Sequence, residues 1–449
     1  MKVLLISTNT MVQPYPTYPI GIDYVMNAIS RYHQVKSVDM NELKDSEALK
    51  AVLLEFCPDV IGLSIRNIDN VDGLYSETFF GQIPKLISTI RSHSKSVIVL
   101  GGSAFTMLPS EFMAELDADF GIVGEGERFL LLLRALEKKE PVSGMPGVVI
   151  GKGHVVFPEP LTTSYHLESI PEHSYLPFYL EKGGMLNLQT KRGCPFRCIY
   201  CTYPHIEGSR FRFAEPKEVA RTARMLQNAG AKYLYITDST FNGSYDHSLK
   251  IALAFKEVGL SIPWGGFFTP TRPPADYYRI LADAGLMHIE FGTEALSDPI
   301  LDAYRKPFRT KDVFESHREA REAGVHIAHY LMLGGPGEDE RTLDETLTNT
   351  SELEKTVFFA FCGIRIYPNA PLYERALKEK QIATGANLLE PVFYYSPAIT
   401  REVVSDRLKA HASQRKNWIL GSHLPGIYKM LEKLYSRGFT GPLWEYLIR

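Results

Sequence analysis

The chain has 449 residues, 45% of them apolar, which is enough for two or three domains with sizeable cores. Its 49 basic and 52 acidic residues give a net charge of -3, which excludes an overall positive field that would attract nucleic acid or an anionic membrane. The opening residues MKVLLISTN are typical of a strand rather than a signal peptide, and no run approaches the ~20 apolar residues of a membrane span. We therefore expect a cytoplasmic protein without a nucleic-acid partner.

Short apolar runs alternate with segments of helical apolar spacing in the first part of the chain. We predict strands at residues 3–7, 37–40, 60–65, 97–100 and 120–123. Strands separated by helices indicate a parallel sheet with helices on both faces, so residues 1–138 are predicted to form a Rossmann-like domain. Ligands bind such sheets at the carboxyl ends of the strands, where this chain carries the loops NTMVQPYPTYPIG, RNIDNVDG, GGSAFT and GEGE. Four unusual loops at one edge favour a binding site over simple turns.

A second series of alternating elements follows a segment rich in proline and glycine. Residues 139–185 are predicted to form a hairpin and a linker. Beyond them we predict strands, separated by helices, at residues 186–190, 233–237, 263–268, 288–291, 327–333 and 358–366. These units predict a partial (β/α)6 TIM-like barrel over residues 186–385, with its active site at the carboxyl ends of the strands. Residues 386–449 are predicted to be a helical C-terminal region.

Three of the five cysteines lie close together in KRGCPFRCIYCTYPH, directly after the first predicted barrel strand. A structural zinc ion takes four protein ligands, so zinc would need His205 in addition to Cys194, Cys198 and Cys201. An iron–sulfur cluster is the other candidate, because cysteine thiolates also hold 4Fe-4S clusters. Three thiolates would then leave one iron open to a small molecule. The spacing alone leaves both metals open.

The CX3CX2C spacing, with the aromatic Tyr200 before the last cysteine, resembles the radical S-adenosylmethionine superfamily. In that family a 4Fe-4S cluster on three cysteines binds S-adenosylmethionine, whose cleavage yields a 5′-deoxyadenosyl radical that removes a hydrogen atom. The resemblance implies that Cys194, Cys198 and Cys201 hold the cluster. It also implies contacts with S-adenosylmethionine from residues at the ends of the barrel strands, namely Tyr200, Asp238, Thr293, Glu294, Gly334, Gly335 and Gly337. Without the family, the two carboxylates could be helix caps and GGPGE a turn.

The N-terminal domain resembles the cobalamin-binding domain that precedes many radical S-adenosylmethionine enzymes. YPIGIDYVMNAI, GGSAFTMLPSEF and FGIVGEGER are similar to three segments of that domain and occur in the same order. The resemblance implies a cobalamin site at the sheet edge, formed by Arg66, Asn67, Gly101, Gly102, Ser103, Gly124, Glu125 and Gly126. Members that ligate cobalt through histidine carry D-x-H-x-x-G after the first strand. This chain has no histidine there, so no protein imidazole is expected below cobalt.

Further expectations concern the burial of three residues and one more candidate for the corrin site. His33 follows a predicted helix and is expected to face solvent. Cys57 and Cys362 lie on or beside apolar runs and are expected to be buried small hydrophobic residues. Asn70, in the loop after the third strand, is a further candidate for lining the lower face of the corrin.

Together the resemblances imply an enzyme with three cofactors, a 4Fe-4S cluster, S-adenosylmethionine and cobalamin. The first hypothesis is a C-methyltransferase in which methylcobalamin supplies a methyl group to an unactivated substrate carbon. The second is a radical rearrangement, cyclisation or oxidation in which cobalamin does not donate methyl, and the third is a cobalamin-binding sensor without catalysis. RNA methylthiolation is disfavoured, because that subgroup typically has further cluster cysteines and an RNA-binding domain. No residue that quenches or relays the radical is assigned.

The expected partners are a small-molecule or lipid substrate and an external electron donor such as flavodoxin or ferredoxin. The RNIDN and QTKRGCP segments resemble the lipid-modifying branch of the family. The C-terminal segment PGIYKMLEKLYSRGF places Ile427, Met430, Leu431 and Leu434 on one helical stripe. This helix either packs over the barrel or makes a peripheral membrane contact, and both interpretations stay open.

Overall fold

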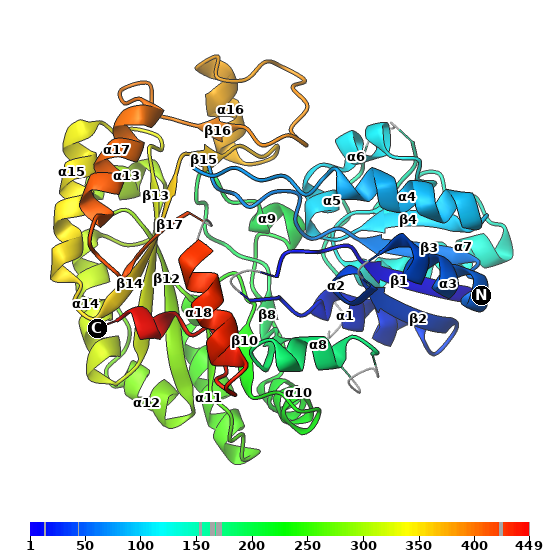
Figure 1. The fold of residues 1–449 in the computed structure, drawn as a ribbon, viewed down its shortest axis with the longest axis horizontal. Helices are drawn as coiled ribbons and strands as arrows, with labels where there is room; N and C mark the ends of the chain where they lie inside the picture. Colours follow the sequence, from blue (N-terminus) through cyan, green and yellow to red (C-terminus); the bar gives the residue numbers. More distant parts are fainter. Residues whose placement is uncertain are drawn as a thin grey trace.

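The computed structural model describes residues 1–12, 15–43, 45–151, 155–161, 167, 173–421 and 425–448, which form two α/β domains side by side (Figure 1). The N-terminal domain, coloured blue to cyan, contains a six-stranded sheet. The second domain contains a seven-stranded sheet. Among the described residues, no helix combines the length and the apolar character needed to cross a membrane.

The N-terminal sheet has the order β2-β1-β3-β4-β5-β6, and only β6 runs antiparallel to its neighbour. Its strands are β1 (Lys2–Ser7), β2 (Gln34–Asp39), β3 (Val60–Ser64), β4 (Val97–Gly101), β5 (Phe120–Ile122) and β6 (Val148–Val149). Successive side chains of a strand point to opposite faces, so Val3 and Leu5 pack under one pair of helices, α1 (Ile20–Ile29) and α7 (Phe129–Lys138). Leu4 and Ile6 pack under α3 (Ser46–Phe56) and α4 (Gln82–His93). The predicted Rossmann-like fold is confirmed.

Strand register brings the unusual loops to one edge of this sheet. Ser7 of β1 pairs with Ser64 of β3, and Ser64 pairs with Gly101 of β4. The loops that follow these strands therefore leave the same carboxyl edge, as predicted. Short helices follow several strands of this sheet, namely α2 (Met40–Leu43) after β2, α5 (Ser103–Met107) and α6 (Pro109–Glu115) after β4, and the 3-10 turn η1 (Gly126–Arg128) after β5.

The second sheet is entirely parallel, with the order β17-β14-β13-β12-β11-β10-β7. Its strands are β7 (Met185–Leu188), β10 (Tyr233–Ile236), β11 (Trp264–Phe268), β12 (Leu286–Glu294), β13 (His326–Leu333), β14 (Thr356–Cys362) and β17 (Trp418–Leu420). The surrounding helices are α10 (Pro216–Asn228), α11 (Tyr245–Glu257), α12 (Tyr277–Asp283), α13 (Asp298–Ala303), α14 (Thr310–Glu322), α15 (Glu340–Asn349) and α17 (Arg401–Ala412). The partial barrel is confirmed, and all six predicted strands are present.

Shorter elements connect the domains and cover the barrel. They are α8 (Leu176–Glu181), β8 (Lys191–Arg192), α9 (Tyr203–Ile206), β9 (Arg212–Phe213), η2 (Phe241–Gly243), η3 (Thr350–Glu352), β15 (Ile364–Arg365), α16 (Pro371–Lys378), β16 (Phe393–Tyr394), α18 (Pro425–Tyr435) and η4 (Trp444–Leu447). Met430 and Leu431 of α18 line a small pocket together with Tyr330, Phe359 and Trp444 of the barrel domain. Met430 and Leu431 of the predicted stripe therefore lie against the barrel domain, while the side chain of Ile427 lies outside the described residues.

Two predicted elements differ from the structure. The C-terminal region is not only helical, because β17 pairs with β14 and adds a seventh strand to the barrel sheet. The predicted strand at 358–366 ends at Cys362, because Gly363 has a φ of +75° and the chain then turns into a separate pair of short strands, β15 and β16. The predicted linker at 139–185 is partly outside the described residues, and its described part contributes β6 and α8.

Two predictions of burial were wrong. His33 is buried, with only 6% of its surface exposed, because its ring packs beside the chain's first residue and its Nδ1 lies 3.5 Å from the Met1 amine. Cys57 is exposed, because it takes a left-handed conformation, with φ at 48°, where α3 ends. Cys362 is buried at the end of β14, as predicted.

Candidate active site

The cysteine loop begins in the β8–β9 hairpin and is held by backbone hydrogen bonds. Cys194 N donates to Gly208 O at 3.0 Å, and Cys201 N donates to Cys198 O at 3.1 Å. Glycine is required at position 193, since φ is +81° and a Cβ would lie 2.1 Å from Arg210 O. Cys194 is buried, and the other two cysteines are half-buried. The loop therefore presents three thiols from one short, sterically constrained turn.

The three thiols share one electrostatic environment. Burial raises the pKa of each, that of Cys201 to about 12, while the ammonium of Lys306 opposes the rise at all three. Thiols bind metals as thiolates, so loading this site would release protons. Within the described ranges, no three His, Cys, Asp or Glu side chains converge as ligands of a single ion do. A four-iron cluster holds its thiolates on separate irons, whereas a zinc ion binds all of its ligands itself.

His205, the fourth ligand that a zinc ion would need, makes other contacts. The ring of His205 packs 4.0 Å from that of Phe157, and its Nε2 lies 3.2 Å from Asn369 Nδ2. Burial also lowers the pKa of His205. These contacts account for the histidine without a metal, and they favour the cluster interpretation.

A buried triad joins the cysteine loop to the carboxyl end of β12. Tyr200 Oη donates to Glu294 Oε1 at 2.8 Å, and Lys306 Nζ donates to the same oxygen at 3.2 Å. Only 11% of the Glu294 side chain and 7% of the Lys306 side chain are exposed. The chain positions Glu294 through a register shift between β12 and β13 and a φ of 63°. Bulges of this kind re-aim side chains beside active sites.

Thr293 does not join this triad. Its Oγ1 lies 2.7 Å from Nδ1 of the buried His329, on the face of β12 that packs against the surrounding helices. Neighbouring residues of a strand point to opposite faces, so the structure separates Thr293 from Glu294.

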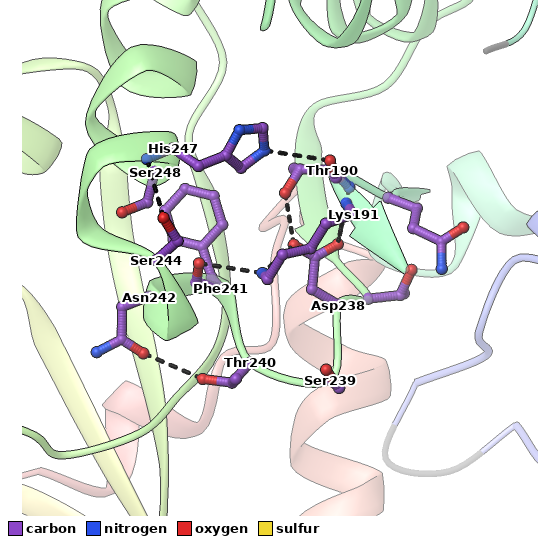
Figure 2. Close-up of polar contacts among 12 residues, drawn as sticks. Thr190, Lys191, Asp238, Ser239, Thr240, Phe241, Asn242, Ser244, His247 and Ser248 are labelled. Carbon is purple, nitrogen blue, oxygen red and sulfur yellow. Dashed lines mark hydrogen bonds and ion pairs between the residues drawn. The ribbon is translucent and has the colours of Figure 1, made fainter. Parts of the chain in front are cut away.

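Asp238 lies at the centre of a buried hydrogen-bond cluster (Figure 2). Its Oδ1 accepts from Thr190 N at 2.7 Å, and its Oδ2 accepts from Lys191 Nζ at 2.8 Å. Lys191 Nζ also donates to Phe241 O at 3.1 Å. The side chains of Asp238 and Lys191 are 0% exposed. This carboxylate secures the segment that enters the cysteine loop, and its contact with S-adenosylmethionine stays a prediction.

The GGPGE loop after β13 is tightly packed. Gly334 and Gly337 have φ of +89° and +84°, and a Cβ on Gly335 would lie 2.2 Å from Tyr304 Oη. Gly334 N donates to the buried Glu338 carboxylate, and burial raises the pKa of that carboxylate to about 8. The glycines thus meet a backbone requirement, and Gly337, with no foreign atom closer than 3.4 Å to its Cβ position, is the most open of the three.

A cavity of about 530 Å³ lies between the two domains. All eight residues predicted to bind cobalamin line it, namely Arg66, Asn67, Gly101, Gly102, Ser103, Gly124, Glu125 and Gly126. Its opposite wall comes from the barrel domain and the cysteine loop, with Asn187, Gln189, Arg192, Thr202, Tyr203 and Glu207. The cavity is therefore shared by the two domains, and its barrel-domain wall includes Thr202, the residue that follows Cys201.

The geometry of this cavity suits a large nucleotide-like group. A Cβ on Gly102 would lie 2.4 Å from Ile65 O, and φ there is +97°, so only glycine permits this course of the backbone. Its lining also includes the apolar Leu5 of β1 and Val99 of β4. Among its described lining residues there is no histidine. Asn70 does not line it, because its amide accepts from Glu77 N and donates to Tyr75 O.

The most prominent residue that the sequence did not reveal is Lys306. It follows α13 in the run YRKPF and sits beside the exposed Arg305, so nothing in the local pattern marks it as buried. In the structure its ammonium contacts Glu294 and Tyr200. Burial lowers the pKa of Lys306, but Glu294, Cys198 and Cys201 together raise it by more. A cation in this position can hold the carboxylate of a ligand or balance the charge of a cluster.

Known families match both domains. A family model of the radical SAM superfamily matches residues 188–349, and one of the B12 binding domain matches residues 7–134. An uncharacterized methyltransferase of Pyrococcus horikoshii is 26% identical over 377 residues, covering 82% of this chain and 80% of that protein. Cytidylyl-2-hydroxyethylphosphonate methyltransferase of Streptomyces wedmorensis is 23% identical over 405 residues, covering 75% of this chain and 73% of that protein.

A solved structure shares the whole fold. The radical S-adenosylmethionine methyltransferase TsrM from Kitasatospora setae, with cobalamin and a 4Fe-4S cluster bound, superposes with a TM-score of 0.88. The alignment covers 99% of this chain and 97% of that chain at 21% identity. The two matched domains, the cysteine loop and the shared cavity together identify the chain as a cobalamin-dependent radical S-adenosylmethionine enzyme.

Proposed function

We propose that this enzyme is a C-methyltransferase that acts on an unactivated carbon of a small molecule. The observation that carries the proposal is the shared cavity, in which the glycine loops of the N-terminal domain face Thr202 and Tyr203 of the cysteine segment. A methyl donor held by the first domain would then lie next to the site where the second domain activates its substrate. When bound, cobalamin would supply the methyl group, and the cluster with S-adenosylmethionine would supply the radical.

The chain's own residues have distinct roles in this proposal. Cys194, Cys198 and Cys201 hold the cluster. Glu294 and Lys306, which pair at 3.2 Å, offer one anionic and one cationic group to the polar parts of S-adenosylmethionine. The backbone of Gly334, Gly335 and Gly337 approaches its adenine side. The side chains of Glu294 and Lys306 are only 11% and 7% exposed, which strengthens the electrostatic contacts that they would make.

The inner face of the barrel offers a wall for the substrate. Tyr235, Phe267, Tyr330 and Phe361 lie on four strands in mutual ring contact, with centroids 5.7–6.3 Å apart. Phe267 is 37% exposed, and Tyr330 and Phe361 are half-buried. The hydroxyls of Tyr235 and Tyr330 donate to the buried Glu290, so the polar atoms of this wall are already paired. Such a surface favours an apolar substrate, and a lipid belongs to that class.

The names of similar proteins support the reaction rather than one substrate. Relatives include a tryptophan 2-C-methyltransferase of Streptomyces laurentii and a hopanoid C-3 methylase of Methylococcus capsulatus, each 23% identical. Their named substrates differ widely in structure. We therefore propose methyl transfer as the common chemistry and an external donor such as flavodoxin or ferredoxin as the electron source. All five cysteines are free, which suits a reducing compartment such as the cytoplasm.

The test is transfer of isotope-labelled methyl from S-adenosylmethionine to candidate apolar substrates by the reconstituted enzyme. We expect labelled product, together with 5′-deoxyadenosine, from the wild type. Cys198→Ala should abolish both, whereas Cys57→Ala, a matched change at the exposed thiol, should leave them unchanged. Product without label would support the rearrangement or oxidation hypothesis. Cobalamin binding without any 5′-deoxyadenosine would favour the sensor hypothesis.

A further inference from the structure

One ion-pair network connects the loop after β5 to both arms of the cysteine hairpin. Glu125 Oε1 lies 3.0 Å from Arg192 Nη1 and 2.7 Å from Arg212 Nη1. Glu127 Oε1 forms a second ion pair with Arg192 Nη1 at 2.7 Å. Arg192 belongs to β8 and Arg212 to β9, and the two residues are register partners in the hairpin. The two glutamates, from the N-terminal domain, thus hold the two strands that frame the cysteine loop.

This network is buried and rigidly connected. The exposed fractions are 6% for the Glu125 side chain, 7% for Arg192, 18% for Glu127 and 21% for Arg212. Arg212 also donates to Leu161 O and Glu207 O, at 2.7 and 2.8 Å. Removing one partner of a buried ion pair leaves an uncompensated charge, which is strongly destabilising for the elements it joins. The cysteine hairpin is therefore tied to the position of the Glu125 loop.

The same loop lines the cavity between the domains. Gly124, Glu125, Gly126 and Glu127 all contribute to its surface, as does Arg192 itself. Space is open beside Gly124, where the nearest atom to a Cβ position would lie 3.9 Å away. A molecule that fills the cavity would restrict this loop on one side, while the arginines restrict it on the other. The loop thus lines the predicted cobalamin cavity and is ion-paired to the strands that flank the cysteine loop.

We propose that Glu125 and Glu127 are positioning residues that couple occupation of the cobalamin cavity to ordering of the cysteine loop. The coupling rests on the proposed function, because it takes cobalamin as the occupant of the cavity. Coupling between two binding sites is reciprocal, so cobalamin favours the cluster-ready hairpin as much as a loaded cluster favours cobalamin. The contacts explain how bound cobalamin would order the cysteine loop. When the Glu125 loop is held in place, its ion pairs hold Arg192 and Arg212, and these two residues flank the cysteine loop.

The test uses the cluster-free full-length protein, labelled under anaerobic conditions with iodoacetamide, with and without saturating hydroxocobalamin. Peptide mass spectrometry follows each cysteine, with the exposed Cys57 and the buried Cys362 as internal references. We expect hydroxocobalamin to slow labelling of Cys194, Cys198 and Cys201 in the wild type at least about fivefold, the lower end of typical couplings. The rate at Cys57 should not change.

The variant Glu125→Gln/Glu127→Gln removes both negative charges and keeps the side-chain shapes. At hydroxocobalamin concentrations that saturate it, we expect the protection of the three cysteines to be lost. Glu127→Gln alone should lose part of it, because Glu125 still bridges the two arginines. Glu115→Gln, at an exposed position of α6 outside the network, should behave as the wild type. Circular dichroism confirms that each variant is folded.

Three outcomes would overturn the coupling. Full protection in the double variant would mean that the corrin shields the thiols directly. Hydroxocobalamin binding to the wild type without protection would refute the coupling and leave the proposed function intact. Absence of hydroxocobalamin binding would refute both. As a second readout, cluster reconstitution should tighten hydroxocobalamin binding to the wild type by the same factor and should not do so in the double variant.

Discussion

The buried ion pair between Lys191 and Asp238 allows a quantitative test of how the cysteine loop is held. Asp238→Asn keeps the size of the side chain and removes its charge. The Lys191 ammonium, 0% exposed and 2.8 Å from the carboxylate, would then be buried without a counter-charge. Breaking a buried ion pair in this way costs about 3–5 kcal/mol of the free energy of unfolding.

The chain contains a matched control for this change. Lys250 and Asp246, on α11, form an ion pair at 2.7 Å, but their side chains are 60% and 77% exposed. Asp246→Asn removes the same charge at nearly the same distance and should cost about 0.5 kcal/mol or less. The two variants differ chiefly in the burial of the ion pair, and Asp238 also accepts a hydrogen bond from Thr190 N, so the expected difference between them is several kcal/mol.

Urea unfolding followed by tryptophan fluorescence measures this difference in the relevant domain. The three tryptophans, Trp264, Trp418 and Trp444, lie in β11, β17 and η4, so the signal reports on the barrel domain. The double variant Lys191→Met/Asp238→Asn should recover part of the stability, since no uncompensated charge remains. If Asp238→Asn costs no more than Asp246→Asn but abolishes S-adenosylmethionine binding, the ion pair does not hold the loop and the carboxylate is a ligand instead.

Three further predictions address other parts of the site. Burial raises the pKa of Glu338 from 4.5 to about 8, so the folded chain keeps a proton that the unfolded chain releases. The free energy of unfolding should therefore fall as pH rises from 4.5 to about 8. In urea titrations at several pH values, Glu338→Gln should make this free energy depend less on pH. Gly102→Ala should lower the melting temperature and weaken hydroxocobalamin binding, because its Cβ would lie 2.4 Å from Ile65 O, whereas Gly101→Ala, with 3.8 Å of clearance, should melt near the wild type. Lys306→Met should weaken equilibrium binding of S-adenosylmethionine to the reconstituted enzyme about tenfold, a loss of 1.4 kcal/mol, and Lys306→Arg should restore most of it; unchanged binding in Lys306→Met would contradict the role given to this cation.

The fold could be predicted almost completely from local patterns. The strand from Val60 to Ser64 and the helix with Ile83, Leu86, Ile87 and Ile90 on one face each follow from the spacing of neighbouring residues. β17 escaped prediction because it has only three residues, Trp418–Leu420, and becomes a strand by pairing with β14. The burial of His33 was missed for a similar reason, since it depends on the distant first residue of the chain.

Some features of the candidate site could likewise be predicted from local sequence patterns, and others could not. The cysteine spacing and the glycine loops are contiguous in sequence, so local pattern alone is enough to recognise them. The orientation of Thr293 away from Glu294 follows from strand alternation, whereas the exact position of Glu294 is not recognisable in this way, because it depends on a register shift between β12 and β13. Lys306 was equally hidden, since its partners Tyr200 and Glu294 lie 106 and 12 residues away in the chain.

The sequence by itself determined the two domains, the thiols and glycines that are predicted to contact the cofactors, and through them the class of enzyme. These features depend on the spacing of neighbouring residues along the chain, which is the same whatever fold the chain adopts. Only the tertiary structure decided which charges meet across the domains, as for Glu125 with Arg192, 67 residues apart, and Asp69 with Arg365, 296 residues apart. Such pairs form because folding buries the two charged residues together. The sequence around a charged residue therefore does not identify its partner.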